Sequence, residues 1–139
     1  MAKRRFSITV ALPAYARPRN EWRRRVHGAV LDVQTRRGVG YRESDRLEVR
    51  ISLPLGDRPL DIHEIDERVK DVIDALEGRI AGPRSRRRIA PIVPSADQIR
   101  RIVLERVPPG ASKEPRRIRR RALGELAISR FHARRRGPG

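Results

Sequence analysis

Three segments of the chain alternate apolar residues with polar or small ones. Residues 6–12 read Phe-Ser-Ile-Thr-Val-Ala-Leu and are followed by Pro13, and residues 46–55 carry the clearest alternation. Residues 97–107 show a third, less regular version of the pattern. A period of two places every second side chain on one face of an extended segment, which is typical of a strand with one buried face. The pattern therefore predicts three strands.

Two further segments carry apolar residues at the spacing of a helix. The first runs from residue 22 to about residue 36 and is followed by Gly38 and Gly40. The second runs from about residue 66 to residue 78, with an apolar stripe at i, i+3, i+4 and i+7. The order strand, helix, strand, helix, strand predicts an α/β (α+β) fold, in which a small mixed sheet of about three to four strands packs with two main helices.

A Pro-Pro-Gly break at residues 108–110 divides the chain into two parts. We predict a domain over residues 1–110, because a chain of 139 residues is long enough for one modest core. Residues 111–139 are expected to form a basic tail, in which residues 119–131 could make a short helix.

Charge changes this picture, because the protein carries a formal net charge of +17 at pH 7. Residues 57–77 are the exception, with eight of the 17 acids and three bases. A basic surface attracts a polyanion, with an affinity that falls steeply with salt. A carboxylate cluster repels that polyanion unless a cation lies between them. The combination predicts a nucleic-acid-binding protein that holds a divalent metal ion against phosphate.

The chain contains no cysteine, which excludes disulfides, thiolate metal sites and cysteine nucleophiles. Its first apolar run is too short for a signal peptide, and no segment has the roughly 18 apolar residues that a membrane span requires. We therefore expect a soluble cytoplasmic protein with no membrane partner.

The candidate metal ligands lie where the chain enters the second helix. Glu64 and Asp66 are two residues apart, so they would share one side of an extended segment. Lys70 lies one helical turn beyond Asp66, where it could touch a phosphate oxygen or an attacking water. Magnesium takes hard oxygen ligands of this kind. The alternative is the solvated face of an amphipathic helix, and composition does not decide between the two.

Two motifs in this region resemble those of the RusA family of Holliday junction resolvases, which occur in phages and prophages. The family's hallmark is Asp-x-Asp-Asn-x-x-Lys-x-x-x-Asp-Ala-Leu, and the residues in register with it here are Asp66, Lys70 and the run Asp74-Ala-Leu76. The second motif, before the next strand, is matched at Pro94, Gln98 and Ile99. The order and spacing of the two motifs carry the resemblance, which extends over residues 6–107.

The resemblance implies a homodimeric enzyme that cuts the opposed strands of branched, four-way DNA junctions with Mg²⁺ or Mn²⁺. By analogy, Glu64, Asp66 and Asp97 would bind the metal ion, and Lys70 would assist the transition state. The remaining carboxylates of the motif are a possible second shell: Asp74, which is otherwise a helix-packing residue, and Glu67, which stands where the family has Asn.

Two positions depart from the family pattern. Glu64 stands in place of the first aspartate, and Ala96 stands in place of the aspartate of the second motif, with Asp97 one residue further on. In an extended segment, a shift of one residue turns the side chain to the opposite face, unless a bulge corrects it. The alternative function is therefore a catalytically impaired or non-catalytic nucleic-acid-binding protein of the same fold.

Arginines outside the acidic segment are the predicted DNA contacts. Arg23 and Arg24 begin the first helix, where positive charge opposes the helix dipole and a bound phosphate would relieve the cost. The others cluster in one loop, where so many like charges favour an anionic partner: Arg84, Arg86, Arg87 and Arg88.

Overall fold

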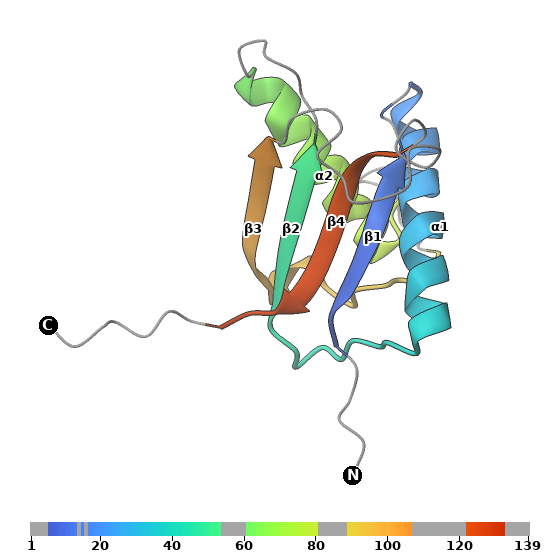
Figure 1. The fold of residues 1–139 in the computed structure, drawn as a ribbon, viewed down its shortest axis with the longest axis vertical. Coiled ribbons are helices and arrows are strands. Elements are labelled where there is room, and N and C mark those ends of the chain that lie inside the picture. The colour runs from blue at the N-terminus through green and yellow to red at the C-terminus, as the bar shows by residue number, and fades with distance from the viewer. Residues whose placement is uncertain are drawn as a thin grey trace, which may run out of the picture.

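The computed structural model describes residues 6–13, 15, 17–53, 61–80, 89–106 and 122–132. These residues form two α-helices, a short 3₁₀ turn and four strands (Figure 1). In chain order the elements are β1 (Ile8–Pro13), α1 (Arg19–Arg37), β2 (Leu47–Leu53), α2 (Ile62–Glu77), η1 (Ala96–Gln98), β3 (Ile99–Arg106) and β4 (Ala122–Arg130).

The four strands make one mixed sheet in the order β1-β4-β2-β3. β4 runs antiparallel to both of its neighbours, whereas β2 and β3 are parallel and are joined through α2. Both helices lie on one face of the sheet (Figure 1). This arrangement confirms the predicted fold class of a small mixed sheet packed with two main helices.

The core lies between that face and the helices. Alternate residues of β1 and β2, and Leu126 and Ile128 of β4, are buried, as the period of two requires, and they meet a buried stripe from each helix. The indole of Trp22 donates a hydrogen bond from Nε1 to the carbonyl oxygen of Pro13 at 3.1 Å, which fixes the start of α1 beside the end of β1. The largest fully buried side chains of this core are Trp22, Leu12, Leu47, Ile51, Leu76, Ile92, Leu126 and Ile128.

Both helices begin earlier than the apolar pattern indicates. α1 begins at Arg19, and α2 begins at Ile62 rather than near residue 66. The start of α2 is capped by Asp61, whose carboxylate accepts a hydrogen bond from the backbone nitrogen of His63 at 2.8 Å. The extra turn adds no fully buried side chain, because Ile62 is 79% exposed and Ile65 is only half-buried. Its consequence is that Glu64 lies inside the helix.

The prediction of a short helix over residues 119–131 is wrong, because residues 122–130 form β4. Leu126 and Ile128 are fully buried at alternate positions. At Gly124 the strand approaches β2 so closely that an added Cβ atom would lie 2.8 Å from the carbonyl oxygen of Ser52. The segment assigned to a basic tail therefore supplies an inner strand of the sheet, and the predicted boundary at residue 110 separates β4 from its partners.

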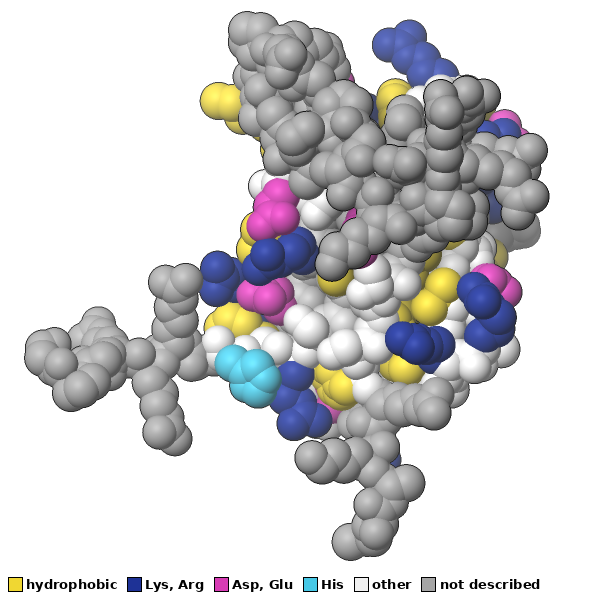
Figure 2. Space-filling model, in the orientation of Figure 1, with side chains coloured by type: hydrophobic (Ala, Val, Ile, Leu, Met, Phe, Trp, Pro, Cys, Tyr) yellow, Lys and Arg dark blue, Asp and Glu magenta, His cyan; other side chains and the backbone are white. Residues whose placement is uncertain are grey.

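The face of the sheet opposite the helices carries mixed charges. Arg50 pairs with Glu105 at 2.9 Å, and Arg101 pairs with Glu48 at 3.1 Å, in both cases between β2 and β3. Among the residues drawn in colour, basic and acidic side chains lie beside one another (Figure 2). The described part of this face therefore offers no single-sign patch for a polyanion.

The end of α2 is tied to the segment that precedes β3. The backbone nitrogen of Ile89 donates to the carbonyl oxygen of Gly78 at 2.9 Å, and those of Ile92 and Val93 donate to Leu76 at 2.9 and 3.0 Å. Gly78 has a φ of +78° and lies so close to the Ile89 carbonyl that a side chain would collide with it. This contact places η1 beside the C-terminal end of α2.

Within the described ranges, neither helix has the length and apolar character needed to cross a membrane.

Candidate functional site

A cleft of about 730 Å³ lies between the segment before α1 and the first two turns of α2. Both acidic and basic side chains reach it, together with one exposed aromatic ring. Its lining residues are Tyr15, Arg17, Pro18, Arg19, Glu64, Glu67 and Arg68.

The acidic side of the cleft comes from one face of α2. Glu64 and Glu67 are three residues apart in a helix, so their side chains are neighbours. Arg68 holds the second of them, since its Nη2 donates to Oε2 of Glu67 at 3.2 Å. The Arg68 guanidinium also stacks on the ring of Tyr15, 3.4 Å from the ring centroid. Two carboxylates and a cation–aromatic pair therefore lie side by side in the cleft.

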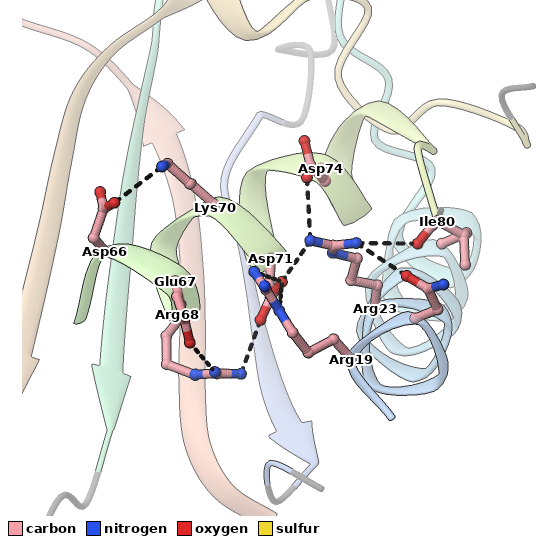
Figure 3. A network of polar contacts seen from close by, with 10 residues as sticks. Arg19, Arg23, Asp66, Glu67, Arg68, Lys70, Asp71, Asp74 and Ile80 are labelled. Carbon is pink, nitrogen blue, oxygen red and sulfur yellow. Dashed lines mark hydrogen bonds and ion pairs between the residues drawn. The ribbon is translucent and has the colours of Figure 1, made fainter. Parts of the chain in front are cut away.

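Beneath the cleft, one buried carboxylate joins the two helices. The side chain of Asp71 has no exposed surface, and three arginines converge on it (Figure 3). Its Oδ1 accepts from Nη2 of Arg19 at 2.9 Å and pairs with Nη2 of Arg23 at 2.8 Å, while Oδ2 accepts from Nη1 of Arg68 at 2.8 Å. The hydrogen bond to Asp71 raises the pKa of Arg19, whose guanidinium also lines the cleft.

The location of Arg23 corrects the expectation that it contacts DNA. Its side chain is buried and is directed into the protein rather than to solvent. Besides Asp71 it contacts Asp74 at 3.6 Å, and it donates to Oδ1 of Asn20 at 3.0 Å and to the Ile80 carbonyl at 3.4 Å. The cost of positive charge near the start of α1 is thus offset by carboxylates of α2 rather than by phosphate.

Arg24, in contrast, is exposed, as a DNA contact requires. Its proposed contact with DNA stays a prediction.

Asp74 also faces α1 rather than the cleft. Burial raises the pKa of its carboxyl group, and the nearby charge of Arg23 acts in the opposite direction without cancelling the effect. Its contacts are those of a residue that joins two helices, in agreement with the helix-packing alternative.

The two carboxylates predicted to share a metal ion do not converge. Because both lie in α2, Glu64 and Asp66 point about 160° apart around the helix axis. Asp66 pairs instead with Lys70 at 3.0 Å, and both side chains are more than half exposed on the side of α2 away from the arginine network (Figure 3). The expectation that Glu64 and Asp66 share one side of an extended segment before the helix is therefore wrong.

Asp97 lies at the opposite end of α2 from Glu64. The residue next to it, Ala96, donates a backbone hydrogen bond to Oε2 of Glu77 at 3.3 Å. Thirteen helical residues separate Glu64 from Glu77, which corresponds to about 20 Å. Asp97 and Glu64 of one chain therefore cannot hold the same ion. Among the described residues, no group of three or more His, Asp or Glu side chains is close enough to hold a metal ion.

The arginines that were predicted to lie in a loop are outside the described residues, so their contact with DNA also stays a prediction: Arg84, Arg86, Arg87 and Arg88. The described residues on either side of this segment are held against α1. Arg23 donates to the carbonyl oxygen of Ile80, and Nε2 of His27 lies 2.7 Å from that of Ala90, where it must act as the donor.

Sequence reasoning missed Tyr15, Arg17 and Arg19 as site residues and placed Glu67 only at the margin. A local signal for the Glu64–Glu67 pair was available. Asp61 followed three residues later by Glu64 is typical of a capped helix start, and it places Glu64 in the first turn, on the same face as Glu67.

Comparison of the chain with protein-family models, with curated proteins and with solved structures returned no match.

Proposed function

We propose that this protein binds branched DNA and hydrolyses a phosphodiester bond with the help of a divalent cation at the cleft. One observation carries the proposal: Glu64 and Glu67 line the same cleft as Arg17 and Arg19. Carboxylates and arginines in one cleft suit a phosphate that is approached from one side by guanidinium groups and from the other by a metal ion.

The residues present fit a magnesium or manganese ion. Mg²⁺ in such enzymes commonly has one or two protein carboxylates, and water and substrate phosphate complete its octahedron. Glu64 and Glu67 supply that number. When bound, the ion would activate a water molecule and neutralise charge that develops on the phosphate. Arg17 and Arg19 bind the non-bridging oxygens and orient the phosphate, and Asp71 holds Arg19 in position.

Branched DNA as the substrate, and a homodimer as the active form, rest on the motif resemblance at Asp66, Lys70 and Asp74. The net charge of +17 supports a polyanionic partner without distinguishing DNA from RNA. In this assignment Lys70, on the other side of α2 from the cleft, contacts a phosphate further along the backbone.

The second candidate function is binding of branched DNA without cleavage. It is favoured by the separation of Glu64, Asp66 and Asp97, which leaves the cleft with two carboxylates where the RusA motif supplies three.

The deciding experiment incubates the protein with a labelled four-way junction and a matched linear duplex, with and without Mg²⁺ or Mn²⁺. We expect metal-dependent nicking of the junction. Glu64→Gln and Glu67→Gln should each reduce the cleavage rate by about 100-fold or more while junction binding persists, because several kcal/mol of transition-state stabilisation are lost.

The matched control is Asp66→Asn, which removes a carboxylate from the same helix but not from the cleft. Cleavage by this variant should stay close to that of the wild type. Loss of cleavage in Asp66→Asn, with normal cleavage in both Gln variants, would refute the cleft as the active site. Selective junction binding without any cleavage would establish the second candidate.

A further inference from the structure

The outer face of α1 has a glycine at its centre. Gly28 is exposed and lies on the side of the helix opposite the buried stripe of Trp22, Val26 and Val30. The described part of the chain gives no structural reason for glycine at this position. A Cβ atom added to Gly28 would meet no heavy atom within 4 Å, and the residue does not have a positive φ.

Glycine is unfavourable here for the helix itself. Apart from proline it has the lowest helix propensity, because it loses the most backbone freedom when the helix forms. Alanine would fit the same space and would favour the helix. The glycine therefore has a cost to folding that nothing within the described residues compensates, and it leaves room for a close approach to the helix backbone from outside.

Two exposed arginines indicate that a group approaching the helix at Gly28 would be anionic. Arg24 and Arg25 precede Gly28 by four and three residues, so their side chains flank the bare stretch of helix. Both are exposed, and neither has a hydrogen bond or ion pair with another described residue. About two turns beyond Gly28, Arg36 is instead paired with Asp32 at 3.0 Å. Two positive charges without an ion-pair partner among the described residues thus lie beside the glycine.

We propose that the outer face of α1 at Gly28 is a docking surface for the phosphodiester backbone of one DNA arm. The backbone lies against the helix at Gly28, and Arg24 and Arg25 bind its phosphates. The inference rests on the proposed function for the identity of the ligand. Gly28 lies nine residues from Arg19, or about 14 Å along the helix, which corresponds to about four base steps of duplex rise. One arm can therefore reach both this surface and the cleft.

A second copy of the chain is a poorer occupant of this surface. Two α1 helices crossing at Gly28 would bring Arg24 and Arg25 of one copy close to the same residues of the other, and like charges repel at short range. A phosphate backbone has the complementary charge and needs the close approach.

The test compares substitutions of increasing size at Gly28. Gly28→Ala and Gly28→Gln should both raise the unfolding temperature, by about 2–5 °C, since both residues favour the helix. The same variants should bind a long-armed junction more weakly, with Kd increased about threefold for Ala and about tenfold or more for Gln. A role in folding alone predicts a higher unfolding temperature and no loss of affinity.

Gly40→Ala is the matched control, because an added Cβ there also meets nothing within 4 Å. Its Kd should stay within about twofold of the wild-type value. Arg24→Gln and Arg25→Gln should each reduce the slope of log affinity against log salt by about one, as expected when one phosphate contact is lost.

The outcomes separate this inference from the proposed function. If the wild type binds the junction and the Gly28 variants bind it equally well, the docking surface is wrong while the proposed function stands. If the wild type binds no DNA, both are wrong. If Gly28→Ala instead turns a dimer into a monomer in sedimentation without changing DNA affinity, the surface is a contact between copies and the inference is overturned.

Discussion

Two aspartates of α2, Asp66 and Asp71, show how differently one acidic segment is used. Asp66 is 59% exposed and pairs with Lys70 on the solvent side of the helix. Asp71 has no exposed side-chain surface and is bound by three arginines from two helices. A count of charges treats the two residues as equals. The orientation of the helix makes one of them available to a ligand and the other a part of the connection between α1 and α2.

The inner cluster is close to neutral, which makes its burial tolerable. The charges of Arg19, Arg23 and Arg68 are balanced by those of Asp71, Asp74 and Glu67, all within one network (Figure 3). Buried charges are costly unless each one is paired and hydrogen-bonded. Two nitrogen atoms, Nε of Arg23 and Nε of Arg68, lack a hydrogen-bond partner among the described residues, so the network is not fully satisfied. It contributes more to the relative placement of the helices than to net stability.

The largest expected effect distinguishes the two aspartates directly. Asp71→Asn leaves two buried arginines, Arg23 and Arg68, without their shared carboxylate, and it should lower the free energy of unfolding by about 3–5 kcal/mol. Asp66→Asn removes an exposed pair, so it should change that quantity by less than about 0.5 kcal/mol. Urea denaturation measures both. Similar losses in the two variants would show that Asp71 is no more important for stability than the exposed Asp66.

A smaller effect is expected when the charge of Arg23 is kept but its shape is changed. Arg23→Lys retains one positive charge and loses the planar fork that reaches two carboxylates, Asn20 and a backbone carbonyl. Stability should fall by about 1–3 kcal/mol, because buried acceptors lose their donors. Arg24→Lys, one residue along on the exposed side, should be neutral. Equal effects at the two positions would contradict the buried assignment of Arg23.

The pH dependence of protein stability tests the effect of burial on a third aspartate of α2, Asp74. Its pKa in the folded protein is raised above the ordinary value of 3.8, so the unfolded chain ionises first as pH rises. The contribution of Asp74 to the free energy of unfolding of the wild type is therefore fully present below the ordinary pKa. It is lost as the pH rises through the pKa that the group has in the folded protein. Asp74→Asn has no such loss.

The stability difference, Asp74→Asn minus wild type, should consequently become more favourable to the variant between pH 3 and pH 7. Chemical denaturation at the two pH values measures it. A difference that stays constant or falls over this range would show that burial does not dominate at Asp74.

The smallest expected effect is at the exposed pair. Lys70→Gln should change the free energy of unfolding by about 0.2–0.5 kcal/mol at low salt and by less at high salt, since i,i+4 pairs on a helix surface are weak and screened. Thermal unfolding at two salt concentrations tests this. A loss above about 1 kcal/mol would place Lys70 in a structural role and remove it as a candidate phosphate contact.

Local patterns predicted the elements well where one face of the element is apolar. The alternation at residues 46–55 and the apolar stripe of α2 correspond to β2 and α2, and the fold class followed from their order. β4 was missed partly because arginines precede its alternating residues. In addition, a local pattern does not reveal that β1 and β2 are joined in the sheet by a strand that lies between them. The start of α2 was missed although Ile62 and Ile65 continue the apolar spacing back to the first turn; neither side chain is fully buried in the structure.

The burial of Arg23 could not be predicted from its neighbours in the chain. An arginine in the first turns of a helix is ordinarily solvated, and the carboxylates that bury this one come from another helix. The same limit applies to the cleft, which combines Tyr15 and Arg17 with Glu64 and Glu67. Only packing of α1 against α2 brings these residues together.

The position of β4 also has a consequence for how the protein is made. β4 is the last of the described strands, yet it lies between β1 and β2, so β1 has no partner among the described strands until β4 is present. During translation the ribosome must deliver residues 122–130 before this sheet can close. Until then, β1 and the β2–β3 pair each expose an unpaired edge, which is a risk for aggregation. A nascent chain halted before residue 122 should therefore be a substrate for chaperones rather than a smaller folded protein.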